Sequence, residues 1–564
     1  MKRTLLLSFI LLISISSWGT NQSPADFRVV CKDGTTFFYP GTDTEMTFNE
    51  DGTILFINNT GATSKHPFSA DFALDAIEAI EFAAPNSYQD KYSFMPPTID
   101  VAIDPSDDTS YTEIPEEVIT DDTHDDYGDF IENYIPSNRV TITYNGTSAT
   151  YTKAPSGVMV MANGADITII STKKNIAYTL KGTTTNGSFK LYSDYKTQVT
   201  LDNVSITNTD GAAINIQSGK TIMVEVKDGT NNTLEDGTTY TMVTNESQKG
   251  TFFSEGQLVF TGNGVLNIKS NYGHGLASDD YIRIRQGYIN IHSIRDGIHT
   301  NDRFLMYKGT INVQAKEDGI DVGKGYVELY GGELTINAGD EGLTASYEGE
   351  DDGTIDPLIT PYIAIKGGLT KVNTIGDKGH GIRAMASLSM TGGILQVTTE
   401  GAGSKAIMAE GDIRLTGGKL TAFTTGSALY ESDINELSSS AALRSKGTLT
   451  IEDMTIGLKS TGKGAKAINN IGDIILRNCT LTALTTGENH KTNDLDSHSR
   501  GIITDGNLTA EGCTVHIKSY DEAIQCGQHC NLSNTIAYAF CKKGSQTQHA
   551  TYALTGSYLI GGYW

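Results

Sequence analysis

The sequence predicts an all-β protein, most of which is a parallel β-solenoid that follows a small β-rich N-terminal module. Three observations carry this prediction: an excess of glycine without a Gly-X-Y period, a repeat of about 22 residues, and apolar residues that alternate with polar ones inside each repeat. Glycine accounts for 60 of the 564 residues, and charged residues make up only 19%. This composition excludes collagen, coiled coils and disordered acidic proteins.

The N-terminus is predicted to be a secretory signal peptide that covers residues 1–19. Lys2 and Arg3 precede an apolar stretch that runs to Ile15, and small residues follow as far as Gly19. A membrane anchor is the weaker interpretation, because the apolar stretch is too short to span a bilayer. We therefore expect an exported protein without a transmembrane segment in the mature chain, in the periplasm, at the cell surface or secreted. We also expect it to be a monomer.

Two regions precede the repeat. Short alternating segments in residues 20–95 predict a small β-rich module. Residues 96–138 contain 13 Asp or Glu and no Lys or Arg between Asp100 and Glu132, which favours an extended acidic linker. The alternative is a cation-binding loop, because five carboxylates of this region lie close together in the chain: Asp121, Asp122, Asp125, Asp126 and Asp129.

From residue 139 to residue 564 the chain repeats itself. Gly275, Gly297 and Gly319 are each 22 residues apart, and Gly342 follows after 23. Each copy contains two or three short strand-like segments, whose inward side chains would stack on those of the next coil about 4.8 Å away. Glycine is expected where a turn needs a positive φ or where a side chain would crowd a corner. A leucine-rich repeat would need a helical half and a propeller a longer period, so the repeat favours a parallel β-helix.

Stacked coils turn each repeat position into a column of neighbours. The residues directly before and after the Gly-Ile or Gly-Leu step flank an inward aliphatic side chain, so alternation places them on the outer face. The acidic strip that results consists of Asp296, Asp318, Asp321 and Glu341, with His299 beside it. Basic side chains follow further along the same columns: Arg383, Lys405, Arg444, Lys466 and Arg500.

The acidic strip predicts a cation, because close carboxylates repel one another unless a positive charge lies between them. Ca²⁺ accepts six to eight oxygen ligands in irregular geometry and suits such a strip. Asp280 and Asp302, which are also 22 residues apart, could form a second calcium site at the adjoining turn. Two alternatives stay open: a solvated acidic edge that limits aggregation, and a zinc site that uses His274 and His299.

Insertions mark the same face of the predicted solenoid. Expansions at about residues 347–361, 425–440 and 486–499 all border the acidic strip, where solenoids commonly place binding loops. A cleft lined by calcium, basic groups and tyrosines suits an extended anionic polymer, whereas the net charge of −25 argues against nucleic acid as a partner. The predicted carbohydrate contacts are His299, Arg383, Lys405, Arg444, Tyr347 and Tyr430.

Five of the six cysteines lie in the last 90 residues. Cys479 and Cys513 occupy the same register of neighbouring coils, where stacked Cα atoms lie within disulfide range. A disulfide and an unbonded ladder of buried thiols are both compatible with this spacing.

The segments TDGAAINIQSGK, SDDYIRI and DGIHTND resemble the bacterial carbohydrate-binding β-helix proteins that are usually labelled carbohydrate-binding domain-containing, and the resemblance covers roughly residues 140–540. It implies a right-handed parallel β-helix related to pectate-lyase-like polysaccharide lyases, calcium binding, and association with cellulose and with pectin-type acidic sugars such as polygalacturonate. The metal ligands that the resemblance suggests are Asp279, Asp280, Asp296, Asn301, Asp302, Asp318 and Asp321. Later coils carry Lys or Arg where Asp stood, and there the resemblance does not extend to calcium.

Three functions are compatible with the sequence. The first is a non-catalytic, calcium-dependent binder of acidic or plant-cell-wall polysaccharides. The second is a polysaccharide lyase that works by calcium-assisted β-elimination, with Lys405, Arg383 or Arg444 as the base. The third is a surface adhesin whose solenoid is a rigid spacer. Trp564 is the only tryptophan outside the signal peptide, so a platform of several tryptophans for crystalline cellulose is excluded.

Overall fold

The structure is a computed structural model that describes residues 24–42, 44–59, 68–88, 99–101, 111, 113–350, 352–543 and 547–563. The predicted signal peptide lies outside these residues. The described part is all-β: its regular elements are strands, apart from two short 3-10 turns, η1 (Asp125–Asp129) and η2 (Ile131–Asn133). In these ranges no helix is long and apolar enough to cross a membrane.

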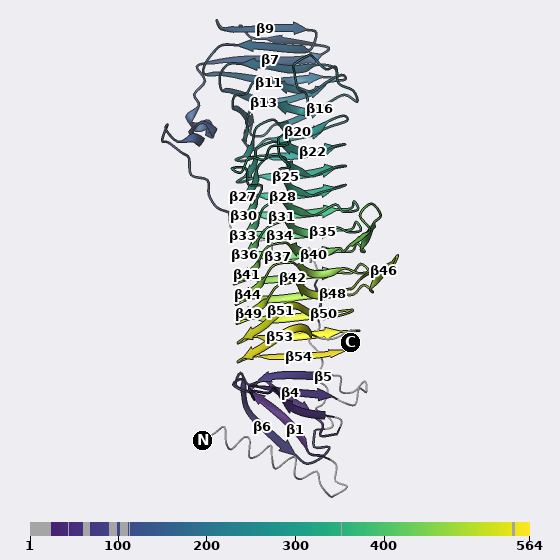
Figure 1. The fold of residues 1–564 in the computed structure, drawn as a ribbon. Helices are drawn as coiled ribbons and strands as arrows, with labels where there is room; N and C mark the ends of the chain where they lie inside the picture. Colours follow the sequence, from purple (N-terminus) through teal and green to yellow (C-terminus); the bar gives the residue numbers. More distant parts are fainter. Residues whose placement is uncertain are drawn as a thin grey trace.

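The strands from residue 138 onward stack into one tall column (Figure 1). Along most of it the strands are parallel, and each pairs with the strand three places further along the chain. A coil therefore supplies three strands, and the coils stack into three columns of strands. This large, mostly parallel sheet is consistent with the predicted parallel β-helix, whereas its right hand stays a prediction.

The first column carries the residues of the acidic strip. Its strands are β10 (Asp166–Ser171), β12 (Ser188–Ser193), β14 (Ile214–Ile216), β17 (Gly250–Ser254), β20 (His274–Ser278), β23 (Ile298–Thr300), β26 (Ile320–Val322), β29 (Leu343–Ala345), β32 (Ile382–Ala384), β35 (Lys405–Ala409), β40 (Ala441–Ser445), β43 (Lys466–Asn470), β48 (Arg500–Thr504) and β51 (Ile524–Ser533).

The second column follows the first after a short turn in each coil. Its strands are β7 (Asn138–Gly146), β11 (Ile176–Thr184), β13 (Thr197–Thr207), β15 (Ile222–Val226), β18 (Leu258–Thr261), β21 (Ile282–Ile284), β24 (Arg303–Met306), β27 (Tyr326–Leu329), β30 (Ile363–Ile365), β33 (Leu388–Met390), β36 (Ile413–Leu415), β41 (Leu449–Glu452), β44 (Ile474–Arg477) and β49 (Leu508–Glu511).

The third column closes each coil. Its strands are β16 (Asn231–Glu235), β19 (Val265–Lys269), β22 (Tyr288–Ser293), β25 (Thr310–Ala315), β28 (Glu333–Ala338), β31 (Leu369–Thr374), β34 (Ile394–Thr399), β37 (Lys419–Thr424), β42 (Thr455–Ser460), β45 (Thr480–Thr485), β50 (Thr514–Ser519), β52 (Ile536–Cys541) and β54 (Tyr558–Tyr563). Three more strands lie at the two ends of the stack: β8 (Ser148–Tyr151), β9 (Val158–Asn163) and β53 (Thr547–Thr555).

The interior of the stack is a continuous apolar core. In the first column Leu276, Ile298 and Ile320 pair in register and are fully buried. Two kinds of glycine make the corners possible, as the repeat predicts. A Cβ atom at Gly297 would overlap the Val313 side chain, and Gly309 adopts a φ of 92°, which favours glycine.

The N-terminal module lies at the C-terminal end of the stack (Figure 1). Its strands are β1 (Asp26–Cys31), β2 (Thr36–Tyr39), β3 (Thr44–Phe48), β4 (Ile54–Asn59), β5 (Phe68–Ala73) and β6 (Ile77–Ala83). Strand β5 pairs antiparallel with β54, the last described strand of the chain, and Phe37 and Phe72 pack edge-on and tilted against Tyr558. The module therefore covers the strand edges that the final coil would otherwise leave open.

Residues 113–138, called the strap below, lie along the outside of the second column (Figure 1). The Ile114 N–H donates to the Tyr330 carbonyl over 3.2 Å, and the Tyr134 hydroxyl donates to the Ile176 carbonyl over 2.8 Å. Phe130 is fully buried. The strap is thus packed against the stack and is not the solvated chain that its charge predicts, whereas residues 102–110 and 112 lie outside the described ranges.

The cysteine register is as predicted. The sulfur atoms of Cys479 and Cys513 lie 3.5 Å apart, and both thiols are free and buried. The structure therefore has the unbonded ladder and not the disulfide.

Candidate metal and polysaccharide site

The first column has the register that the repeat predicts. His299 pairs with Asp321, Asp321 with Thr344, and Thr344 with Arg383. Further along, Arg383 pairs with Met408 and Met408 with Arg444. The backbone N–H groups of Gly275, Gly297 and Gly319 donate to the carbonyls of Asp296, Asp318 and Glu341, respectively. The residues directly before the glycines are therefore also stacked from coil to coil.

Asp296 lies between two histidines of adjacent coils. Its Oδ2 atom is 3.0 Å from His274 Nδ1 and 3.6 Å from His299 Nδ1, and its side chain is 10% exposed. The carboxylate of Asp321 approaches His299 Nδ1 to 3.0 Å from the next coil. Three stacked coils therefore place imidazole and carboxylate groups in a row, each next to the following one.

The imidazole and carboxylate groups of this cluster stabilise one another's charged forms. Burial alone would raise the pKa of Asp296, but the two imidazoles hold the pKa of this carboxyl well below its usual range. Burial alone would lower the pKa of His299, but the carboxylates of Asp296 and Asp321 raise it to about 9. In the absence of a metal, His299 thus carries a proton at neutral pH.

Asp318 and Glu341 form the second part of the acidic strip. Asp318 Oδ1 accepts a hydrogen bond of 2.8 Å from the Glu341 backbone N–H. Burial, together with the carboxylates of Asp296, Glu341 and Asp321, raises the pKa of Asp318 to about 8. Burial likewise raises the pKa of Glu341, although Arg383 lies 3.3 Å from its carboxylate.

Asp280 and Asp302 come together at the adjoining turn, as predicted from their spacing. Burial and the Asp302 carboxylate raise the pKa of Asp280 to about 6, and Gln257 donates to the Asp280 carboxylate. Asp279 forms an ion pair of 2.5 Å with Lys249, and the Asn301 amide donates to the Asp279 carbonyl over 3.1 Å. The side chains of Asp279 and Asn301 are therefore engaged in contacts inside the fold.

The donor sets divide the predicted calcium ligands into two kinds. Asp318 with Glu341, and Asp280 with Asp302, offer carboxylate oxygens only, the donors that Ca²⁺ prefers. The crowded carboxylate of Asp318 fits a cation, because burial and negative neighbours raise its pKa and, among the described residues, no basic side chain opposes them. Around Asp296 two imidazole nitrogens join the oxygens, which is a different donor set.

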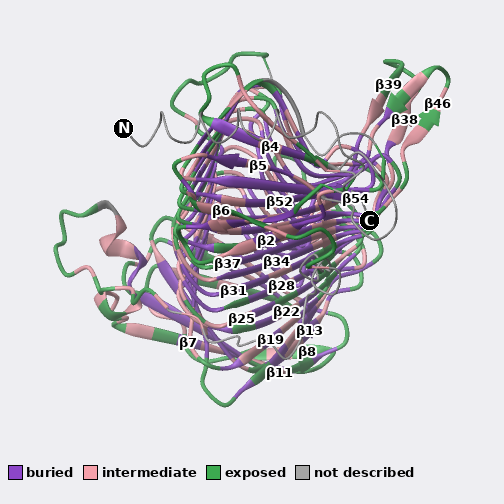
Figure 2. Cartoon of the chain, turned by 90° about the horizontal axis from the view of Figure 1, so that it is seen from below, coloured by how far each residue is buried: buried purple, intermediate pink, exposed green. Residues whose placement is uncertain are grey.

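Lys405 and Lys466, two of the basic side chains predicted to lie on the outer face, are buried instead. Hairpin β38 (Leu429–Glu431) with β39 (Glu436–Ser438) projects from the stack next to hairpin β46 (His490–Thr492) with β47 (Leu495–Ser497) (Figure 2). Lys405 donates to the Gly403 carbonyl over 2.7 Å and to Ser438 Oγ over 2.9 Å, and it is buried. Lys466 is held in the same way by Gly464 and Ser497.

This burial changes what Lys405 can do. Burial and the nearby charge of Arg444 lower the pKa of Lys405 to about 8. A lysine with such a pKa is a stronger candidate base, but its amino group is enclosed by the hairpin that contains Ser438. Because a polymer must reach the base, the enclosed position does not favour Lys405 as the lyase base.

The remaining predicted carbohydrate contacts differ in their accessibility. Tyr347 is buried, and its hydroxyl donates to Glu350 over 3.0 Å, so its ring face is covered. Tyr430 is half-buried in its hairpin and donates to Asn435 Oδ1 over 3.1 Å. Arg383 and Arg444 are half-buried, and burial lowers the pKa of Arg444.

A shallow hollow of about 320 Å³ lies at the corner where the third column leads into the first column. The hollow lies next to the acidic strip, because Ser293 and Ala315 in its wall are three positions before Asp296 and Asp318, respectively. The polar side chains that line it are Lys269, Ser270, Asn271, His292, Ser293, Gln314 and Lys316.

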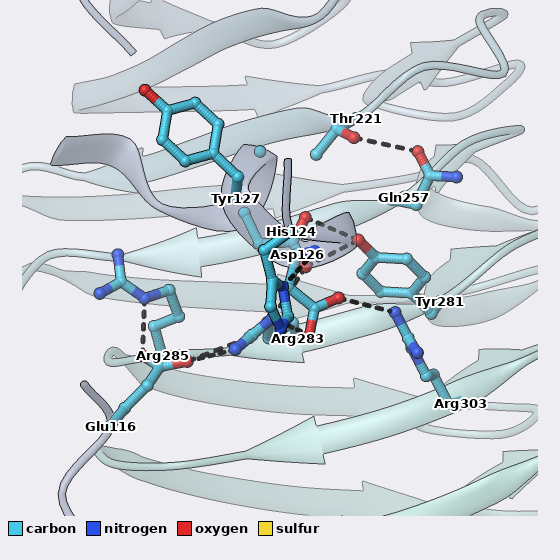
Figure 3. A network of polar contacts seen from close by, with 12 residues as sticks. Glu116, His124, Asp126, Tyr127, Thr221, Gln257, Tyr281, Arg283, Arg285 and Arg303 are labelled. Atoms are coloured by element: carbon cyan, nitrogen blue, oxygen red, sulfur yellow. Dashed lines mark hydrogen bonds and ion pairs between the residues drawn. The ribbon is translucent and has the colours of Figure 1, made fainter. Parts of the chain in front are cut away.

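Strap carboxylates meet basic side chains of the second column in a network that was not predicted from the sequence (Figure 3). Glu116 accepts hydrogen bonds of 2.7–3.0 Å from Arg283 and one of 2.7 Å from Arg285. Asp129 accepts from Arg283 over 2.9 Å and from the Tyr281 hydroxyl over 2.6 Å. These arginines are therefore occupied by the chain itself.

A signal for this network was present in the sequence. Arg283 and Arg285 alternate on one outward face, and Arg303 lies in the next coil, in a chain whose net charge is −25. A cluster of three arginines in a chain that also has 13 acidic residues without a Lys or Arg among them indicates charge complementarity. Neither feature specifies by itself where the acidic segment lies.

A second mixed cluster at His498, Asp521 and Glu522 was also missed. Its donor atoms already have partners, because Asp521 Oδ2 accepts from both His498 and Asn489, and Glu522 pairs with Arg500 over 2.8 Å. His498 lies in an insertion, outside the repeat frame, so no column position pointed to it.

Comparison with known proteins agrees with the resemblance. The profile of the family described as "Carbohydrate-binding domain-containing protein" matches residues 163–356 and 376–539. A protein of that description from Acetivibrio thermocellus is 30% identical over 118 residues, which cover 20% of this chain and 41% of the relative, so the match spans less than half of the relative.

Among solved structures, the polysaccharide lyase-like protein from C. thermocellum, a gadolinium derivative, matches with a TM-score of 0.36 and 22% identity. The match covers 50% of this chain and 99% of that chain. Since the family profile covers more than half of the sequence, the chain belongs to the family of carbohydrate-binding domain-containing proteins.

Proposed function

We propose that the protein is an exported, non-catalytic binder of acidic or plant-cell-wall polysaccharides, and that it binds them with the help of Ca²⁺ on a right-handed parallel β-helix. Membership of a carbohydrate-binding family supports polysaccharide as the ligand. The observation that carries the proposal is the position of Asp318, a carboxylate crowded by other carboxylates with Arg383 in the next but one coil.

The geometry of the strip suits an anionic polymer. Asp318 and Glu341 would hold Ca²⁺, with Asp280 and Asp302 as a second pair, and the bound ion would supply positive charge to a glycan carboxylate. Arg383, half-buried at 3.3 Å from Glu341, is placed to pair with a carboxylate of the same chain of sugars. The hollow beside the strip offers polar groups to sugar hydroxyls.

The decisive experiment is retention of the purified chain on immobilised polygalacturonate, in calcium and in excess chelator. We expect the chelator to abolish retention, and the double variant Asp318→Asn/Glu341→Gln to lower the apparent affinity for calcium by about tenfold or more. Glu333→Gln is the matched control, because Glu333 is an exposed carboxylate on the third column. Equal retention with and without chelator would overturn the role of calcium.

The same samples separate binder from lyase. A lyase would release unsaturated sugars, which absorb in the ultraviolet. We expect no growth of this absorbance while the protein stays bound. A steady increase that depends on calcium would replace the non-catalytic assignment with the lyase.

A further inference from the structure

Two histidines stack at the start of the acidic strip. The rings of His274 on β20 and His299 on β23 have centroids 4.6 Å apart and planes inclined by 15°. Both Nδ1 atoms face Oδ2 of Asp296, at 3.0 and 3.6 Å, and Asp321 Oδ2 lies 3.0 Å from His299 Nδ1. Two nitrogens and one oxygen from two coils thus converge, and Asp321 of the third coil contacts His299.

The separations of Asp296 Oδ2 from the two nitrogens fit a small four-coordinate ion. Zinc binds imidazole nitrogen and carboxylate oxygen at about 2.0–2.2 Å, so neighbouring ligand atoms of a tetrahedral site lie about 3.3–3.6 Å apart. The observed separations of 3.0 and 3.6 Å are close to this range. Calcium would need more and longer oxygen contacts.

His274 adds an independent observation. Its Nδ1 atom is buried and has no hydrogen-bond partner, although Asp296 Oδ2 is only 3.0 Å away. The oxygen is therefore near the nitrogen but outside the direction in which the ring can form a hydrogen bond. An ion on the axis of the nitrogen lone pair, with the oxygen as a neighbouring ligand, would satisfy both atoms.

We infer that His274, Asp296 and His299 form a binding site for a transition-metal ion of the zinc class, distinct from the carboxylate-only pairs proposed for calcium. Imidazole with carboxylate is a donor set that suits zinc, cobalt, nickel and copper. The cluster at His498 does not carry the same inference, because its carboxylates are already hydrogen-bonded or ion-paired. The inference does not depend on glycan binding.

The test uses the full chain, freed of metal with chelator and then titrated with cobalt chloride. Four-coordinate Co²⁺ has intense visible absorption, which six-coordinate Co²⁺ lacks. We expect one equivalent of Co²⁺ to develop this absorption, one equivalent of Zn²⁺ to remove it, and millimolar Ca²⁺ to leave it unchanged. His274→Gln and His299→Gln should each remove the absorption and lower the bound metal by one equivalent.

The matched control is His292→Gln, because His292 is an exposed histidine on β22 of the same coil as His274. It should bind cobalt like the unchanged chain. Thermal unfolding monitors the fold of each variant. Asp296→Asn, which changes the shared carboxylate without loss of a histidine, should also lose the absorption. Three results would each overturn the site. They are no absorption from the chain without substitutions, spectra of the histidine variants identical to its spectrum, and displacement of Co²⁺ by Ca²⁺.

Retention on polygalacturonate distinguishes this inference from the proposed function. Both histidine variants should keep calcium-dependent retention while they lose cobalt. If retention fails in every sample but the cobalt site titrates as described, only the proposed function is wrong.

Discussion

At the scale of single residues, the corner glycines of the first column are set by the side chain that faces them across the coil. A Cβ atom at Gly275, Gly297 or Gly501 would overlap Ile291, Val313 or Ile517, respectively. Where the corner residue is alanine, the residue 16 positions later is alanine in three coils: Ala406 with Ala422, Ala467 with Ala483, and Ala523 with Ala539. Ala442, with Leu458, departs from this rule.

This relation predicts the cost of adding one methyl group. Gly297→Ala should lower the free energy of unfolding by about 1–3 kcal/mol, because the methyl overlaps Val313. In Gly297→Ala/Val313→Ala the combined loss should be smaller than the sum of the single losses by about 1 kcal/mol or more. Denaturant unfolding measures all three variants.

Gly323→Ala is the control for this cycle, since a Cβ atom there meets open space. It should change stability by less than about 0.5 kcal/mol. If Gly297→Ala behaves like Gly323→Ala, or if the double variant is simply additive, the packing explanation is wrong.

At the scale of elements, the strap is held by one aromatic side chain and a set of buried ion pairs. Phe130 is fully buried, and its ring lies 4.4 Å from the Arg285 guanidinium and 5.2 Å from that of Arg283. Asp129 and Arg283 are almost completely buried as well. Such a pair is costly to break, because the remaining partner is left as an uncompensated buried charge.

Phe130→Ala should therefore release the strap. We expect the free energy of unfolding to fall by about 3–5 kcal/mol, as for other buried phenylalanines, and protease cleavage within residues 113–138 to become faster. Limited proteolysis followed by mass spectrometry locates the cuts. The control is Glu132→Gln, whose pair with Arg285 involves a half-exposed glutamate and should contribute at most about 1 kcal/mol. Equal cleavage rates in both variants would contradict the anchoring role of Phe130.

At the scale of the whole molecule, the C-terminal end of the stack contacts the N-terminal module. The N-terminal module covers the last coil through β5 and β54, the strap runs beside the second column, and the first coils form at the opposite end (Figure 1). Open strand edges invite pairing with other chains, and covering them is a common protection. The module is thus a cap for the end of the stack.

Removal of the cap gives a prediction for the whole chain. A variant that begins at Pro96 exposes the backbone of β54 and should self-associate, whereas we expect the complete chain to be monomeric. Size-exclusion chromatography with light scattering compares the two. A shortened chain that stays monomeric, with the same melting temperature, would show that the module does not protect this edge.

The sequence by itself determined the repeat and everything that follows from its register. The columns that contain His299, Asp321, Arg383 and Arg444 follow from counting residues between glycines, because alternation fixes the side of a strand and stacking fixes the neighbour. The acidic strip and the pair of Asp280 and Asp302 belong to this set.

Only the tertiary structure decided what covers the stack. Arg283 and Asp129 meet across 154 residues, and Lys405 is enclosed by a hairpin that follows it by about 30 residues. Neither contact lies within the repeat, so no periodicity predicts it. Periodic stacking transmits order from one coil to the next, whereas the strap, the cap and the hairpins are placed by complementary charge and apolar burial between segments far apart in the chain.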